Sequence, residues 1–132
     1  MSQTIVVDNS VIVYALTESA GTELLRRRLS APRQMHAPAL IDFEFLSAMR
    51  GMLVGRKITE VVADQALRDF FDLPITRHPG AETFKRAWEL RHNYNPYDAS
   101  YVALAESLGS TLLTSDRKLE GSHSARVEVI AI

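Results

Sequence analysis

The sequence predicts an α/β domain with a mostly parallel central β-sheet flanked by helices on both faces. Short apolar segments that are typical of buried strands alternate along the chain with longer segments of helical periodicity. Strands joined through helices run parallel and are buried on both faces. The length of 132 residues suits about one domain. No linker, repeat or low-complexity tract divides the sequence, so a single domain is expected over 1–132.

The first half of the chain is punctuated by residues that turn or break a helix or strand. Asp8 follows the apolar run TIVV, Pro32 ends a helical pattern, and Pro74 and Pro79 bracket ITRH. The predicted elements are a strand at 4–7, a short helix after Asp8, a helix at 19–29, a strand at 34–38, helices at 40–55 and 59–72, and a strand at 75–78.

The second half begins with AETFKRAWEL, in which Ala81, Phe84 and Trp88 share one helical face that we expect to lie in the core. Pro96 then starts a helix that Gly109 should end. The segments STLLTSD and VEVIAI are the last two predicted strands.

Composition excludes several classes of protein. With no cysteine, the chain forms neither a disulfide framework nor a thiolate zinc site, and a cytoplasmic location is expected. No apolar run approaches the roughly 20 residues that cross a bilayer, so no membrane association is expected. The net charge is −1, so any contact with nucleic acid depends on local basic clusters such as 26–28 or 50–57, which also suit solvated helix faces.

Four acidic residues fall where the strand ends of such a sheet converge. Asp8 directly follows the first strand, Asp116 follows TLLT, and the helix that carries Glu44 starts just after MHAP. Asp98 lies in the first turn of the helix that begins at Pro96, on the face that should pack on the sheet. Parallel sheets bind ligands outside the carboxyl ends of their strands. All four carboxylates are therefore expected at one rim.

Each acid also has a purely structural explanation. Asp8 and Asn9 are favoured helix N-caps, and the helix dipole favours Asp98. Glu44 shares a helical face with apolar and small residues, where a carboxylate needs a partner, whereas Asp42 should face solvent on the opposite side. Four converging carboxylates repel and raise one another's pKa unless a cation lies among them, which favours a common site.

Oxygen ligands without histidine or cysteine match a hard cation, so Mg²⁺ or Mn²⁺ is the expected cofactor. Such a cation polarises a phosphoryl oxygen and lowers the pKa of bound water, which suits phosphate chemistry. The histidines have no ligand-like spacing and are interpreted as surface or core residues: His36, His78, His92 and His123.

Three segments carry a family resemblance: VVDNSVIV, APALIDFEFLSAMR and YDASYVALAESLGSTLLTSD. In this order and over nearly the whole chain, they resemble PIN-domain ribonucleases, specifically the VapC toxins of type II toxin–antitoxin pairs. The resemblance implies a PIN-like domain and a Mg²⁺- or Mn²⁺-dependent endoribonuclease that uses activated water and leaves a 5′-phosphate and a 3′-hydroxyl. It assigns the acidic set to Asp8, Glu44, Asp98 and Asp116, and supporting hydroxyls to Ser10 and Thr114.

The same resemblance implies partners. These are an RNA substrate such as tRNA or rRNA, a cognate VapB-type antitoxin that covers the active site, and a second copy of the chain in a homodimer. The apolar surface of helix 40–55 suits burial either in a dimer interface or in the core. Asn9 departs from the Ala or Thr expected between Asp8 and Ser10.

Three other functions also fit parts of this pattern. A phosphatase of the haloacid dehalogenase type needs a second Asp where this chain has Ser10, and a receiver domain needs a lysine for which Lys118 is poorly placed. A non-catalytic PIN-like RNA-binding or regulatory module remains the alternative, because a fold alone does not establish activity.

Overall fold

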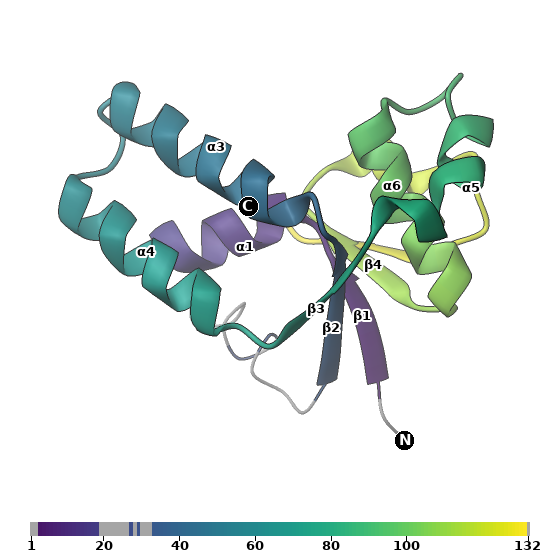
Figure 1. Cartoon of the computed structure of the whole chain (residues 1–132), viewed down its shortest axis with the longest axis horizontal. Coiled ribbons are helices and arrows are strands. Elements are labelled where there is room, and N and C mark those ends of the chain that lie inside the picture. The colour runs from purple at the N-terminus through teal and green to yellow at the C-terminus, as the bar shows by residue number, and fades with distance from the viewer. Residues whose placement is uncertain (1–2, 19–26, 28, 30–32, 132) are drawn as a thin grey trace.

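The computed structural model describes residues 3–18, 27, 29 and 33–131 (Figure 1). Within them a five-stranded sheet has the order β3-β2-β1-β4-β5, and each neighbouring pair runs parallel. The predicted parallel α/β fold is therefore confirmed. The strands are β1 (Gln3–Val7), β2 (Arg33–Pro38), β3 (Ile75–His78), β4 (Thr111–Thr114) and β5 (Val127–Val129).

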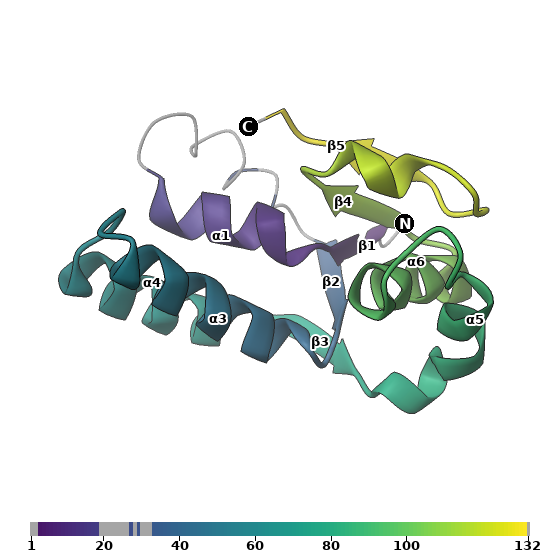
Figure 2. The ribbon, with the colours of Figure 1, turned by 90° about the horizontal axis from the view of Figure 1, so that it is seen from above.

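The helices form two groups, one on each face of the sheet. The helices α1, α3 and α4 lie on one face, and α5 and α6 lie on the other (Figures 1 and 2). The helix predicted at 19–29 falls outside the described residues, except for Arg27 and Leu29, which are helical. The bounds are α1 (Asn9–Thr17), α3 (Ile41–Val54), α4 (Glu60–Asp72), α5 (Phe84–Glu89) and α6 (Pro96–Leu108), with single 3₁₀ turns η1 (Gly80–Glu82) and η2 (Arg117–Glu120).

Local chemistry explains where these helices begin and end. The Thr59 hydroxyl accepts a hydrogen bond from the Val62 amide at 3.2 Å, which caps α4. At α6, Asn95 provides the cap before Pro96, and Gly109 ends the helix with φ of 61°, a left-handed conformation that glycine adopts without strain. The boundaries predicted for α6 are thus confirmed. No helix within the described residues is long and apolar enough to cross a membrane.

The predicted core stripe of Ala81, Phe84 and Trp88 is wrong. Phe84 is 77% exposed and Trp88 66% exposed. The turn η1 is separate from α5, so these residues do not share one continuous helix. Thr83 and Leu90 are the buried residues here, which shows that the inward face is offset from the aromatic stripe.

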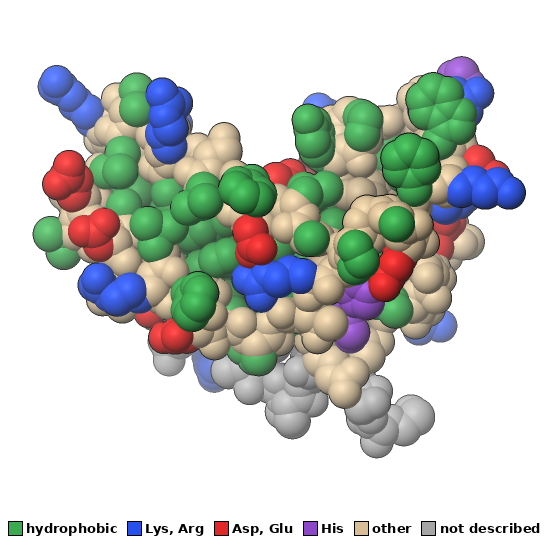
Figure 3. Space-filling model, viewed as in Figure 1, with side chains coloured by type: hydrophobic (Ala, Val, Ile, Leu, Met, Phe, Trp, Pro, Cys, Tyr) green, Lys and Arg blue, Asp and Glu red, His purple; other side chains and the backbone are tan. Residues whose placement is uncertain are grey.

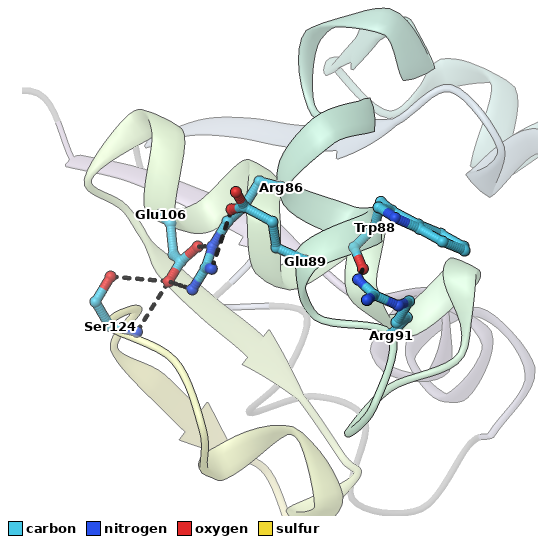
Figure 4. Close-up of polar contacts among 6 residues, drawn as sticks. All are labelled: Arg86, Trp88, Glu89, Arg91, Glu106 and Ser124. Carbon is cyan, nitrogen blue, oxygen red and sulfur yellow. Dashed lines mark hydrogen bonds and ion pairs between the residues drawn. The ribbon is translucent and has the colours of Figure 1, made fainter.

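A network around Glu106 ties the α5–α6 layer to the segment before β5 (Figure 4). Glu106 Oε1 accepts from Arg86 Nε at 2.7 Å, and Oε2 accepts from Arg86 Nη2 at 3.1 Å. The amide and hydroxyl of Ser124 both donate to Oε2 at 2.9 Å. The bonds from Arg86, followed by those from Ser124, lower the pKa of Glu106 to about 2.

Glu106→Gln should lower the free energy of unfolding at pH 7 by about 1–3 kcal/mol, because it weakens charge-assisted hydrogen bonds. A depressed folded-state pKa contributes stability that is complete above the ordinary value of 4.5 and is lost as the pH falls toward about 2. The difference between wild type and variant should therefore shrink across that interval. Denaturant titrations at several pH values measure it.

Glu89→Gln is the matched control, since Glu89 is half-exposed and contacts the same arginine only at 3.4 Å. Its effect should stay within about 0.5 kcal/mol. An equal loss in both variants would contradict the assignment of stability to Glu106.

Candidate active site

Asp8 stands at the point where β1 turns into α1. Its amide donates to the Leu113 carbonyl of β4 at 2.9 Å, which extends the strand pairing by one residue. Asp8 occupies the N-cap position of α1, as one interpretation predicted, but its side chain makes no capping hydrogen bond. Instead, Oδ2 accepts from the hydroxyls of Thr114 at 2.6 Å and Ser10 at 2.9 Å. The two predicted supporting hydroxyls therefore hold one oxygen of Asp8.

The same hydroxyls fix the loop that carries Asp116. Thr114 Oγ1 accepts from the Asp116 amide at 3.0 Å, and Ser10 Oγ accepts from the Ser115 amide at 3.3 Å. The Asp116 carboxylate accepts from the Lys118 amide at 2.9 Å, which caps η2. The loop after β4 is thus tied to the turn after β1.

Glu44 has a partner that sequence analysis missed. The Tyr101 hydroxyl, on α6, donates to Glu44 Oε1 at 2.6 Å. Tyr101 is 1% exposed, and burial followed by the Glu44 charge raises its pKa, so it remains a neutral donor. The sequence did contain a signal for this contact. Tyr101 lies on the buried face of the helix that carries Asp98, and a buried tyrosine hydroxyl needs an acceptor.

Asp98 and Asp42 occupy contrasting places. The Asp98 amide donates to the capping oxygen of Asn95 at 2.8 Å, so Asp98 sits in the first turn of α6, where it was predicted. Asp42 precedes Glu44 by two residues on α3 and pairs with Arg77 of β3 at 2.9 Å; its side chain is 41% exposed. Asp42 thus takes no part in the acidic group, in agreement with the expectation that it faces away.

The acids of the rim influence one another electrostatically. Burial raises the pKa of Asp8, Glu44 and Asp98. The charges of Asp8 and Asp98 add to the rise at Glu44, and those of Asp8 and Asp116 add to the rise at Asp98, where the Lys118 charge acts in the opposite direction. Asp8 and Asp98 therefore interact with both Glu44 and Asp116, which links the four acids in one group.

This set of donors suits a hard divalent cation. Every donor is an oxygen, and a cation among them would reverse the raised pKa values by favouring the ionised forms. No three His, Asp or Glu side chains in the part of the chain that the structure describes already stand close enough together to hold a metal. Direct coordination by three or more of these carboxylates would therefore need side-chain rotations in the acidic group.

A hollow beside Glu44 gives access to the rim. It has a volume of about 370 Å³. Figure 3 shows this face, with a depression between the α3–α4 arm and the α5–α6 arm. The Oδ1 atom of Asn9 is buried there without a hydrogen-bond partner among the described residues. The lining residues are Asn9, Glu44, Ser47, Ala48 and Tyr97.

Comparison with known proteins gives consistent matches. The PIN domain family model matches residues 5–121. The chain is 35% identical over 128 residues to VapC ribonuclease Mb0985 of Mycobacterium bovis, covering 97% of this chain and 98% of the relative. It is 37% identical over 130 residues to Ribonuclease VapC12 of Mycobacterium tuberculosis, covering 96% and 99%. The crystal structure of PAE2754 from Pyrobaculum aerophilum matches with a TM-score of 0.67 and 25% identity, covering 91% of this chain and 86% of that one.

Asp8→Asn should leave the metal-free protein as stable as wild type or more stable at pH 7. Because the folded-state pKa of Asp8 is raised, the ionised carboxylate reduces stability as the pH rises above its ordinary value of 3.8. Mg²⁺ should in turn stabilise wild type more than the variant, since a ligand that binds only the folded state adds stability with its saturation. Thermal melts in chelator and in Mg²⁺ measure both effects. An undiminished Mg²⁺ shift in the variant would remove Asp8 from the cation site.

Tyr101→Phe should raise the pKa of Glu44 further, because the lost hydrogen bond is one that lowers it. Metal affinity should fall about 10- to 100-fold, as is usual when a group that orients a ligand is removed. Metal titrations at several pH values measure both changes. Tyr94→Phe is the control, since the Tyr94 hydroxyl donates to the Gly121 carbonyl instead. Equal losses in the two variants would indicate a general packing effect.

Proposed function

Because the chain belongs to the PIN-domain family, we propose that it is a VapC-type toxin of a type II toxin–antitoxin pair, an endoribonuclease that hydrolyses RNA phosphodiester bonds with the help of Mg²⁺ or Mn²⁺. Two relatives of nearly the same length carry the name ribonuclease. The observation that carries the proposal is the buried Asp8 carboxylate, held by two hydroxyls within electrostatic range of Glu44, Asp98 and Asp116.

In this proposal the acidic side chains of the rim bind the cation, and two hydroxyl side chains hold one of the acids in place. Asp8, Glu44, Asp98 and Asp116 hold the cation, which when bound polarises the scissile phosphoryl group and lowers the pKa of water. Ser10 and Thr114 donate to one oxygen of Asp8, which leaves its other oxygen available as a ligand.

Tyr101 and Lys118 have supporting roles in the same proposal. The hydrogen bond from Tyr101 to Oε1 opposes the rise in the pKa of Glu44 that burial causes, and it fixes the orientation of the carboxylate. The Lys118 charge, which lowers the pKa of Asp98, is placed to offset the negative charge of an approaching phosphate.

The proposed substrate is structured RNA, such as tRNA or rRNA, cut in an accessible loop. The hollow beside Glu44 is lined by Tyr97, whose side chain is 60% exposed and offers a surface for base stacking. Lysine and arginine side chains lie at the ends of both arms that flank the hollow (Figure 3). They can contact phosphates on either side of the bond that is cut.

We also propose a homodimer and a VapB-type antitoxin that covers the rim. Phe43 and Leu46 of α3 and Trp88 of α5 are exposed by 74%, 48% and 66%. These apolar side chains on the two arms suit burial against a partner. Phe45 and Met49 of α3 are buried in the core, which is one of the two placements expected for the apolar surface of this helix. Light scattering should show a dimer at micromolar concentration and a change to monomer for Trp88→Glu; a monomeric wild type would contradict this part.

RNA cleavage with matched variants of two neighbouring acids tests the proposed activity. Wild type should cut RNA in Mg²⁺ or Mn²⁺ and not in chelator. Glu44→Gln should reduce the cleavage rate by roughly 100-fold or more, since it removes a charge from the cation site. Asp42→Asn should cleave at close to the wild-type rate, because Asp42 pairs with Arg77 away from the rim.

Two outcomes would contradict the proposal. Undiminished cleavage by Glu44→Gln would remove Glu44 from the mechanism. A folded wild type that binds RNA and never cuts it in either metal would favour the non-catalytic RNA-binding module.

A further inference from the structure

Two histidines that are 42 residues apart in the sequence meet on the sheet. His36 lies in β2 and His78 ends β3, and the register pairs His36 with Thr76 and Pro38 with His78. The two histidines are therefore offset by two positions on neighbouring strands, which places them on the same face. His36 Nδ1 and His78 Nε2 are 2.8 Å apart, and the ring planes are inclined by 42°. Both are partly buried, and the sequence pattern did not predict that they contact each other.

A carboxylate fixes the tautomer of one ring. His78 Nδ1 lies 2.7 Å from Glu82 Oε2. An ionised carboxylate can only accept, so His78 carries a proton on Nδ1, and in the neutral ring Nε2 then presents its lone pair to His36. His36 Nδ1 then donates to that lone pair. A carboxylate that holds the far nitrogen of an imidazole is the arrangement found behind histidine ligands in metal sites.

We propose that His36 and His78 form a second metal site, for a divalent transition metal that prefers imidazole, with Glu82 as the residue that orients His78. In binding, the metal replaces the hydrogen bond between the rings. His36 loses its Nδ1 proton and takes one at Nε2, so both rings stay neutral. Burial, and then the proximity of His78, lowers the pKa of His36, which keeps it available as a neutral ligand at physiological pH.

The ligand type indicates which metals fit, because imidazole nitrogens suit Cu²⁺, Ni²⁺ and Zn²⁺. The two nitrogens lie at hydrogen-bonding distance, 2.8 Å, so one metal ion can reach both once each ring turns to aim its lone pair at the metal. Water completes the coordination.

The site is separate from the acidic rim. The hydrogen bonds of Asp8, Glu44 and Asp98 described above involve neither imidazole. The side chain of His78 is 15% exposed and that of Glu82 50% exposed, so a hydrated ion can reach them. Figure 3 shows histidine side chains at the surface beside an acidic one.

Calorimetric titration of tag-free protein with Ni²⁺, in excess Mg²⁺ that occupies the rim, tests the proposal. Wild type should bind one equivalent. His36→Gln and His78→Gln should each weaken the affinity at least tenfold, and Glu82→Gln should weaken it about tenfold. His92→Gln, at an exposed histidine elsewhere, and Asp98→Asn, at the rim, should bind as wild type does.

Electron paramagnetic resonance of the wild-type protein with one equivalent of Cu²⁺ gives a second readout that needs no substitution. It should show two imidazole nitrogens in the plane of the metal. Wild-type affinity in both His36→Gln and His78→Gln, or a Cu²⁺ spectrum with oxygen ligands alone, would overturn the proposal. Loss of binding in Asp98→Asn instead would assign the metal to the rim.

Discussion

The candidate site depends on a single oxygen, Asp8 Oδ2, which accepts hydrogen bonds from two hydroxyls. Ser10 and Thr114 reach it from the two chain segments that follow β1 and β4. Because Asp8 is 8% exposed, its ionised form is tolerated only while these donors compensate for the lost water. The same hydroxyls accept from the amides of Ser115 and Asp116. One buried carboxylate thus determines the path of two loops and the position of a second acid.

The acidic group also shows how function opposes stability. Burial and like charge raise the pKa of three carboxylates, so the group is under electrostatic strain without a cation. Outside the acidic group, acidic side chains form ordinary ion pairs with basic ones: Asp42 pairs with Arg77, and Glu106 pairs with Arg86. Such an unfavourable concentration of one charge is expected at a functional site rather than in a scaffold.

Much of the fold and the location of the acids could be predicted because they depend on local chemistry. Asn95, Pro96 and Gly109 mark the ends of α6 through capping and backbone preference, and periodicity separates Glu44 from Asp42 two residues away. The sequence indicates that Tyr101 needs an acceptor, but not that this acceptor is Glu44, which depends on how α6 meets α3. The contact of His36 with His78 could not be predicted, since it depends on the register between β2 and β3. The prediction that Phe84 and Trp88 of α5 lie in the core was wrong because periodicity identifies an apolar face of a helix. It does not tell whether that face packs on the core or lies at the surface.

The sheet order has a consequence for the synthesis of the protein. β1 is the central strand, with β2 on one side and β4 on the other. The bond between Thr114 and Asp8 spans 106 residues, so neither that bond nor the loop with Asp116 can form until β4 has left the ribosome. Nascent chains that already contain Asp8, Glu44 and Asp98 still carry an incomplete rim. In the proposed mechanism, the cation site of a nascent chain is therefore complete only after most of the chain has been translated.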